Sequence, residues 1–342
     1  MLEQDATGSH QGPVVSRRTV LSWAAALGGS MAFASACGSG DEGGGGAGGL
    51  TGSAAISGLQ SIVTAAPFAI AAKEFYAEAS VKLTNVHISG GTDTVRSIMG
   101  KSPVGSAATV SSIIAYQAGA TKLRIIAGGF NAPSVVFVGK SGSDITRDKE
   151  LSGKKIGIAG TGSPVEFFAK LAITKAGYTP GKEVEIVAVG DYASVWPSVK
   201  EGIVDLGALV PPQSAQATMS GEGEIVISSA DLMPKWADTS ICTTTDVIKE
   251  QPEALRGWLG AVDSALTMIR EDLPQAAQIW AAHLDIPREV AEEALKSVPT
   301  EAWTLDLDMS YLKEPAAAAV ELGLSKRADV GDLFDGSILE SM

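Results

Sequence analysis

The segment Gly160-Thr161-Gly162-Ser163-Pro164 carries the clearest chemical signal in this 342-residue sequence. Its glycines allow the backbone to turn with positive φ, Ser163 is a residue type that caps helices, and Pro164 suits the first helical position. Free N–H groups at such a helix start attract an anion by about 0.3–1 kcal/mol. The segment therefore predicts either a ligand-binding helix N-terminus or only a well-formed helix start. It lacks the third glycine of a dinucleotide-binding motif and the lysine of a P-loop.

Three more strand-to-helix junctions, at residues 64–68, 89–92 and 106–109, are rich in small and hydroxyl residues. In open α/β sheets, ligands bind outside the carboxyl ends of the strands, where such junctions lie. These residue types are suited to holding a small molecule by hydrogen bonds. Arg96 follows Thr92 by one helical turn, so it is either a partner for a ligand carboxylate or sulfonate, or a solvated arginine.

The sequence offers few groups for covalent or metal chemistry. It contains two cysteines, Cys37 and Cys242, and neither an H-E-x-x-H nor a C-x-x-C motif. We therefore predict no catalytic residues, no metal site and no cofactor. Cys242 lies among apolar and hydroxyl residues, and we expect it to be a small buried side chain rather than a nucleophile.

The first residues predict export from the cytoplasm. Arg17 and Arg18 precede an apolar run that ends in small residues, which is typical of a secretory signal, and the paired arginines resemble the twin-arginine (Tat) address. The run is shorter than the ~20 residues needed to cross a bilayer. The sequence ASAC at residues 34–37 resembles a bacterial lipobox, so we expect residues 1–36 to be removed and Cys37 to be acylated. Ordinary cleavage after Ala36 is the alternative.

Composition limits what the remaining chain can do. Residues 37–55 are rich in glycine and predict a flexible tether between a lipid anchor and a globular region. Hydrophobic residues make up 45% and charged residues 19% of the chain, which is typical of a soluble globular protein. The net charge is −13 and no run of Lys or Arg offsets it, which argues against nucleic-acid binding. Without a disulfide framework, the hydrophobic core must supply the stability.

Short apolar runs alternate with helical patterns up to Asp246, and only helical patterns follow. The predicted strands are residues 59–65, 81–89, 104–108, 123–130, 134–140, 154–160, 183–189, 204–210 and 224–229. The predicted helices are residues 68–79, 92–99, 110–117, 165–176, 193–200, 252–270, 273–283, 288–297 and 310–322. This alternation indicates βαβ units and parallel sheets covered on both faces. It does not distinguish one wide sheet from two lobes.

These features resemble the substrate-binding lipoproteins of ABC importers, in the periplasmic-binding-protein-like group that takes up sulfonates, nitrate and thiamine-precursor pyrimidines. The similarity spans roughly residues 56–335 and is best over 150–215, where a strand, a glycine-serine turn and a helix follow in the family's order. Residues 97–108 and 329–335 are similar to an early turn and to the closing segment. Where that early turn usually carries an aspartate, this chain has Pro103-Val104.

The resemblance implies an α/β fold of the two-lobed periplasmic-binding-protein type II class, with hinge crossovers and a helical C-terminal tail. Lobe 1 would comprise residues 56–138 plus 236–342, and lobe 2 residues 139–235. The ligand-binding loops of the family would fall on Pro67, Phe68, Gly91, Thr92, Ala107, Thr109, Asn131, Thr161, Ser163, Asp191, Tyr192 and Pro211.

The implied function is that of a monomeric, lipid-anchored receptor outside the cytoplasm. It would bind a sulfonate, an aromatic acid or a pyrimidine-like molecule and deliver it to an ABC permease in the membrane. Two alternatives remain. One is an enzyme of the same fold, such as a lyase or cyclase of cofactor synthesis, with Asp191 and Arg96 as its titratable pair. The other is a ligand-sensing lipoprotein. The cysteine-rich motif of the related pyrimidine synthases is not found here.

Overall fold

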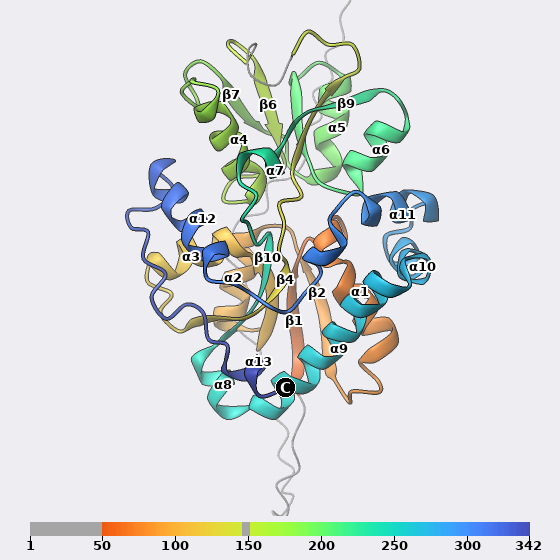
Figure 1. The fold of residues 1–342 in the computed structure, drawn as a ribbon, viewed down its shortest axis with the longest axis vertical. Helices are drawn as coiled ribbons and strands as arrows, with labels where there is room; N and C mark the ends of the chain where they lie inside the picture. The colour runs from red at the N-terminus through yellow and green to blue at the C-terminus, as the bar shows by residue number, and fades with distance from the viewer. Residues whose placement is uncertain (1–49, 146–150) are drawn as a thin grey trace, which may run out of the picture. The chain divides into compact units, whose positions relative to one another are not determined.

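The computed structural model of the chain describes residues 50–145 and 151–342 (Figure 1). The predicted export signal, the lipidation site Cys37 and most of the predicted tether lie outside these residues. The described chain contains two five-stranded sheets with helices between their strands, which confirms the predicted α/β fold class. No helix of this part of the chain combines the length and the apolar character needed to cross a membrane.

The first sheet has the strand order β2-β1-β3-β10-β4, and the second has the order β7-β6-β8-β5-β9. The strands of the first sheet are β1 (Thr51–Ser57), β2 (Lys82–Ile88), β3 (Val104–Ala108), β4 (Leu123–Phe130) and β10 (Thr239–Thr244). Those of the second are β5 (Val136–Lys140), β6 (Lys155–Ile158), β7 (Glu185–Ala188), β8 (Leu206–Leu209) and β9 (Gly223–Ser228).

Helices connect the strands of each sheet and form the whole C-terminal region after β10. The first sheet is connected by the short η1 (Val63–Ala65), α1 (Ala66–Ile70), the π-helical turn η2 (Ala71–Phe75), α2 (Gly91–Gly100) and α3 (Thr109–Gln117). The second is connected by α4 (Pro164–Lys175), α5 (Tyr192–Lys200) and α6 (Gln213–Met219), with α7 (Ser229–Leu232) after it. The C-terminal region holds α8 (Thr245–Glu250), α9 (Pro252–Glu271), α10 (Leu273–Leu284), α11 (Arg288–Lys296), η3 (Thr300–Ala302), α12 (Ser310–Glu321) and α13 (Ser337–Glu340).

Each sheet contains one strand that runs against its neighbours. Strand β10 pairs antiparallel with β3 and β4, and β5 pairs antiparallel with β8 and β9. The prediction of parallel sheets is therefore wrong for β5, and β10, for which no strand was predicted, is a second exception. A parallel neighbour requires a crossover connection over the sheet, whereas β5 and β10 each enter directly from the other sheet (Figure 1).

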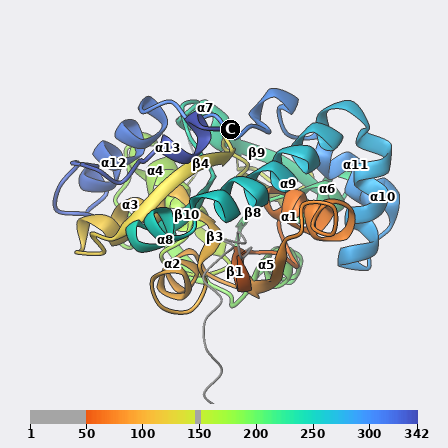
Figure 2. The ribbon, with the colours of Figure 1, turned by 90° about the horizontal axis from the view of Figure 1, so that it is seen from below.

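Alternating side chains of the first sheet supply two hydrophobic clusters. Ala54 of β1 belongs to the cluster that contains Trp258 of α9, whereas its neighbour Ala55 belongs to the cluster that contains Ile98 of α2. Successive residues of a strand point to opposite faces of the sheet. Helices α1 and α9 therefore pack on one face of the first sheet, and α2 packs on the other (Figure 2).

Two segments, residues 131–135 and 229–238, carry the chain from the first sheet to the second and back. We call them the crossovers. They are hydrogen bonded to each other, because Ser229 N donates to Val135 O at 3.0 Å and Asp238 N donates to Phe130 O, at the end of β4, at 2.8 Å. The two crossovers therefore run together as a pair, rather than as two independent linkers.

Several predicted elements agree closely with the structure, and two strands do not. Strands β3 and β4 have the predicted bounds. The predicted strand at residues 59–65 is wrong, because β1 spans Thr51–Ser57 and thus also takes residues 51–55 from the predicted tether. A Cβ on Gly105 of β3 would lie 2.2 Å from the carbonyl oxygen of Ala55, so this part of the sheet is closely packed. Strand β1 itself, TGSAAIS, has Ile56 as its one large apolar residue and therefore resembles the glycine-rich segment that precedes it. Strand β10 was not predicted.

Candidate functional site

A cavity of about 470 Å³ lies where loops of the first sheet meet loops of the second. These loops follow β1, β2, β6 and β7, so the cavity lies at the carboxyl ends of parallel strands, the expected position for a ligand in an open α/β sheet. The lining residues are Gln60, Ser61, His87, Ser89 and Gly90 from the first sheet, and Ala159, Gly160, Thr161, Ser163, Gly190, Asp191, Tyr192 and Ala193 from the second.

The start of α4 forms one wall of this cavity. Gly162 adopts a φ of 70°, which glycine tolerates best, and Pro164 takes the first helical position as predicted. Ser163 lies at the N-cap position, but its hydroxyl donates to Gly160 O at 2.6 Å and does not cap the helix. Instead, Gly162 N donates to Glu166 Oε2 at 2.6 Å. The chain therefore satisfies part of this helix start with its own carboxylate.

The start of α5 forms the adjoining wall. Asp191 is the N-cap residue, and its carboxylate accepts a hydrogen bond from Ser194 N at 2.8 Å. The next residue, Tyr192, is half-buried. Burial raises the pKa of Tyr192, and the negative charge of Asp238 raises it further. The phenol therefore stays protonated near neutral pH and can donate a hydrogen bond.

His87 lies in the opposite wall, at the end of β2. Its Nδ1 atom accepts a hydrogen bond from Gln60 N at 3.2 Å, and its Nε2 atom lies 3.5 Å from Ser89 Oγ. Burial lowers the pKa of His87. An imidazole that accepts through Nδ1 carries its proton on Nε2 and is neutral.

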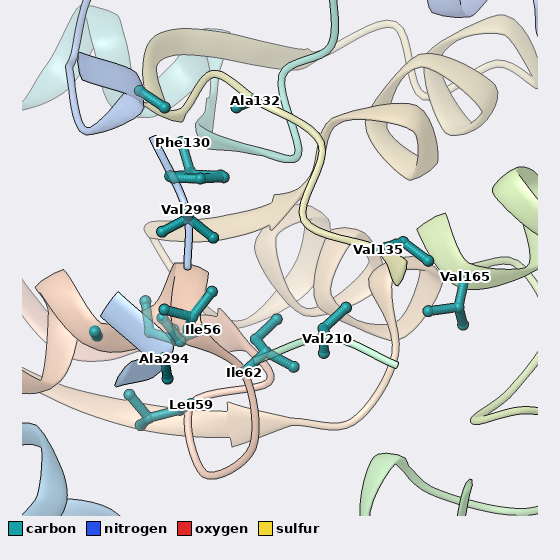
Figure 3. Packing of buried hydrophobic residues seen from close by; sticks show 14 of the residues in the cluster. Ile56, Leu59, Ile62, Phe130, Ala132, Val135, Val165, Val210, Ala294 and Val298 are labelled. Carbon is teal, nitrogen blue, oxygen red and sulfur yellow. The ribbon is translucent and has the colours of Figure 1, made fainter. Parts of the chain in front are cut away.

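Direct contacts join the loops of the two sheets beside the cavity. Ser111 Oγ of α3 donates to Gly162 O at 2.9 Å, and a Cβ on Gly162 would lie 2.9 Å from Thr92 Oγ1. Elsewhere, Val63 N donates to Pro211 O at 2.8 Å. The neighbouring side chains Ile62 and Val210 belong to the same hydrophobic cluster (Figure 3). The facing loops therefore touch around the cavity instead of being separated by solvent.

A buried carboxylate lies in the second crossover. Asp238 accepts hydrogen bonds from Ser134 Oγ of the first crossover and from Trp236 Nε1, the latter at 3.2 Å. Burial raises its pKa from 3.8 to about 6, although both hydrogen bonds act in the opposite direction. The ring of Trp236 also packs against Phe167 and Phe168 of α4, with centroid distances of 4.8 and 4.6 Å. Residues 236–238 therefore connect both crossovers to α4, whose N-cap residue Ser163 lines the cavity.

The structure brings four of the sequence-predicted site residues together at the cavity. They are Thr161, Ser163, Asp191 and Tyr192. Three more lie near it without lining it, since Thr92 and the buried Gly91 begin α2 beside Gly162, and Pro211 accepts the hydrogen bond from Val63.

The other five predicted site residues have different surroundings. Pro67 and Phe68 are buried in α1, and the Phe68 ring stacks on Trp258 at a centroid distance of 6.0 Å. Ala107 is buried in β3. The hydroxyl of Thr109 is hydrogen bonded to the hydroxyl of Ser240, and the amide of Asn131 donates to Asp306 O. None of these five lines the cavity, within the part of the chain that the structure describes.

Sequence reasoning missed Gln60, Ser61 and His87. The predicted strand at residues 59–65 placed the first two inside a sheet, whereas they belong to the loop after β1. His87 lies in a strand whose existence was predicted, but nothing in the sequence indicated which strand ends face the second sheet. The signal that was available is the position of His87 near the carboxyl end of a predicted parallel strand, where ligands of open α/β sheets bind.

The described residues offer little for metal or nucleophilic chemistry. They contain no group of three or more His, Cys, Asp or Glu side chains that could hold a metal ion. Cys242 is fully buried in β10, as predicted, and burial raises its pKa to about 12. A thiol in this state is a poor nucleophile near neutral pH.

Solved structures of solute-binding proteins share this fold. The alkanesulfonate-binding protein SsuA from Xanthomonas axonopodis pv. citri, bound to MOPS, is 17% identical and matches with a TM-score of 0.69, over 81% of this chain and 94% of that one. The aliphatic sulphonate binding protein SsuA from Escherichia coli is 16% identical, with a TM-score of 0.69 and coverage of 83% and 96%. For the nitrate-binding protein NrtA from Synechocystis PCC 6803 the identity is 14%, the TM-score 0.69 and the coverage 85% and 88%.

Two sheets joined by paired crossovers, with a cavity between the facing loops, define the periplasmic-binding-protein fold that these structures share. The sequence comparison identifies a family in addition to the fold. A sequence model of the NMT1/THI5-like family matches residues 63–277, and the chain belongs to that family. No curated protein matches the sequence.

Proposed function

We propose that this chain is the solute receptor of an ABC importer. The observation that supports this best is the cavity of about 470 Å³ lined by loops from both sheets, next to a pair of crossovers that can act as a hinge. A solute held from both sides favours the closed arrangement, because only a ligand with higher affinity for one arrangement can shift the equilibrium. A permease can then distinguish the loaded receptor from the empty one.

In this proposal the moving bodies are the lobes around the two sheets. They follow the predicted bounds, residues 56–138 plus 236–342 and residues 139–235, except that all of β1 joins the first lobe and all of β5 joins the second. The residues that hold the solute are those predicted residues that line the cavity, Thr161, Ser163, Asp191 and Tyr192, together with Gln60 and His87. The chain would act as a monomer outside the cytoplasm, anchored through an acylated Cys37 after Tat export. Sulfonates, aromatic acids and pyrimidine-like molecules are the starting candidates for the solute.

An enzyme of the same fold and a ligand-sensing lipoprotein are the alternatives. The enzyme requires a titratable pair at the site, but the Arg96 side chain is 74% exposed and paired with Asp93. Product formation after prolonged incubation with a bound solute would support the enzyme. Uptake that depends on a neighbouring permease and ATPase would support transport over sensing.

The test is calorimetric titration of the purified chain with the candidate solutes. A Kd near a micromolar, about −8 kcal/mol, is sufficient for a receptor of this kind. Ser163→Trp should abolish binding, because the indole would fill the cavity. Ser220→Trp is the matched control, since the Ser220 hydroxyl likewise donates to the carbonyl three residues earlier, but on an exposed site away from the cavity. Equal binding by both variants would contradict the proposed site.

A further inference from the structure

We propose that the cavity selects a solute without net negative charge, one that directs an N–H donor toward the carboxylate of Asp191. This inference rests on the proposed function and narrows its candidates. It would set the chain apart from a receptor for sulfonates or carboxylates. Four observations on the residues around the cavity support it.

The first observation is the charge of the lining. Among the cavity-lining residues of the described chain there is no Lys or Arg, and Asp191 is the single Asp or Glu. Arg96, the cation that the sequence singles out as a partner for a ligand carboxylate or sulfonate, is paired with Asp93 on the exposed face of α2. An anion entering this cavity would leave water without gaining a cationic partner, which is unfavourable.

The second observation concerns the two helix starts that form the walls. Such ends attract anions only while their N–H groups are free. A carboxylate of the chain already lies at each of them, because Glu166 Oε2 in the first turn of α4 accepts from Gly162 N, two residues before that helix, and Asp191 Oδ1 accepts from Ser194 N in the first turn of α5. Each end thus holds an anionic group of its own chain. The other oxygen of Glu166 pairs with Lys170 Nζ at 2.9 Å, so this lysine is occupied as well.

The third observation concerns His87, the remaining side chain at the cavity that can become cationic near neutral pH. Its Nδ1 atom accepts a hydrogen bond from Gln60 N, and protonation of Nδ1 would break this bond. Burial also lowers the pKa of His87, in the direction that keeps it neutral. His87 therefore offers no positive charge to a ligand.

The fourth observation concerns the acceptor that remains. The hydrogen bond of Asp191 to Ser194 uses Oδ1, and within the described residues no partner is found for Oδ2. A carboxylate accepts several hydrogen bonds, and charge-assisted bonds from N–H donors are the stronger kind. An amine, an amidinium or an amide N–H fits this acceptor, whereas a sulfonate or a carboxylate would be repelled by it.

The inference is tested by titrating the full purified chain with matched probes that differ in charge. The first set is benzenesulfonate (anionic), benzenesulfonamide (neutral) and benzylamine (cationic). The second set carries a sulfonate, a sulfonamide or an amine on a propyl chain. We expect the neutral or the cationic member of a set to bind at least about tenfold more tightly than the anion. An anion that binds as tightly as its neutral counterpart overturns the charge inference and leaves the receptor function standing. Absence of binding across both sets, and across the pyrimidine-like candidates, counts against the receptor function itself.

Two variants locate the effect. Asp191→Asn keeps one oxygen for the N-cap but removes the charge and places an NH2 donor where Oδ2 was, so the affinity for the cationic probe should fall about tenfold or more, and that for the neutral N–H probe should fall less. Asp205→Asn is the matched control, since Asp205 also accepts a main-chain N–H, from Lys155, away from the cavity. Glu166→Ala removes a negative charge beside the wall formed by Gly160, Thr161 and Ser163 and should increase anion binding. Unchanged probe affinities in both Asp191→Asn and Glu166→Ala overturn the inference.

Discussion

The hydroxyl of Ser134 donates a hydrogen bond to the buried carboxylate of Asp238, and this contact joins the two crossovers between the sheets. Trp236 Nε1 donates to the same carboxylate at 3.2 Å, and Thr109 N, at the start of α3, donates to Asp238 O at 3.1 Å. One residue therefore connects both crossovers with a helix of the first sheet. Any rotation of the sheets must bend the crossovers together around this point.

Asp238→Ala should lower the free energy of unfolding by about 1–3 kcal/mol for each donor that is left buried without an acceptor. The donors are Ser134 Oγ and Trp236 Nε1. Urea unfolding of the variant and the parent chain measures this loss. Asp332→Ala, at an exposed position, serves as the control and should change little. A loss no larger than that of the control would contradict the proposed importance of the buried carboxylate.

Stability should also depend on pH through Asp238. Its pKa is about 6 in the folded chain against an ordinary 3.8, so the folded state binds more protons than the unfolded state between these values. The contribution of this group to stability is present below about pH 4 and is lost as the pH rises through about 6, with a size on the order of 3 kcal/mol. Asp238→Asn removes the titration. The difference in unfolding free energy between the parent and Asp238→Asn should therefore fall from about pH 4 to about pH 7, and a constant difference would contradict the assignment.

Gly162→Ala should destabilise the chain more than Gly177→Ala. Both glycines have positive φ, 70° and 86°, so both substitutions strain the backbone by about 1 kcal/mol or more. A Cβ on Gly162 would also lie 2.9 Å from Thr92 Oγ1, whereas a Cβ on Gly177 would meet no atom within 4 Å. The difference between their thermal midpoints isolates the contact with α2. Adding Thr92→Ala should restore part of the loss in Gly162→Ala and none in Gly177→Ala.

Ser111→Ala should weaken solute binding without a comparable loss of stability. Its hydroxyl donates to Gly162 O at 2.9 Å and thereby joins a helix of the first sheet to a loop of the second. Loss of about 1 kcal/mol from this contact raises the Kd roughly fivefold if the contact forms only in the closed arrangement. Ser112→Ala is the control, because the contacts of that hydroxyl stay within the first sheet and its helices, to Ala108 O and to Cys242 Sγ at 3.5 Å. An unchanged Kd in Ser111→Ala would show that the contact does not contribute to closure.

Side-chain size alone does not decide how well a strand is predicted from sequence. Strands β3 and β4 were both predicted with their observed bounds, although β3 consists mostly of small residues and β4 contains Leu123, Ile125, Ile126 and Phe130. Strand β1 was misplaced because it continues directly from the glycine-rich segment before it, and its run of Thr, Gly, Ser and Ala resembles a linker. Strand β10 was missed for a related reason, since its pattern of Thr, Ser and Cys is weakly apolar.

Prediction of the site was more limited. The glycine-serine turn before α4 and the Asp191–Tyr192 pair before α5 were identified, and both line the cavity. The burial of Phe68 against Trp258 was beyond sequence reasoning, because these residues come from helices far apart in the chain. The hydrogen bond from Gly162 N to Glu166 Oε2 was also beyond sequence reasoning, because it depends on the side-chain rotamer that turns Glu166 back toward Gly162.

The sequence by itself determined the α/β class, the helical C-terminal region, most helix bounds and the residues that begin α4 and α5, because hydrophobic period and capping chemistry are local properties of the chain. Local pattern left one wide sheet or two lobes open, the family resemblance implied two lobes, and the structure confirmed two sheets. Only the tertiary structure decided that β5 and β10 run against their neighbours and that the first and second sets of loops enclose one cavity. It also decided which polar atoms at that cavity remain free. Contacts between residues distant in sequence control these features, and local pattern contains no information on them.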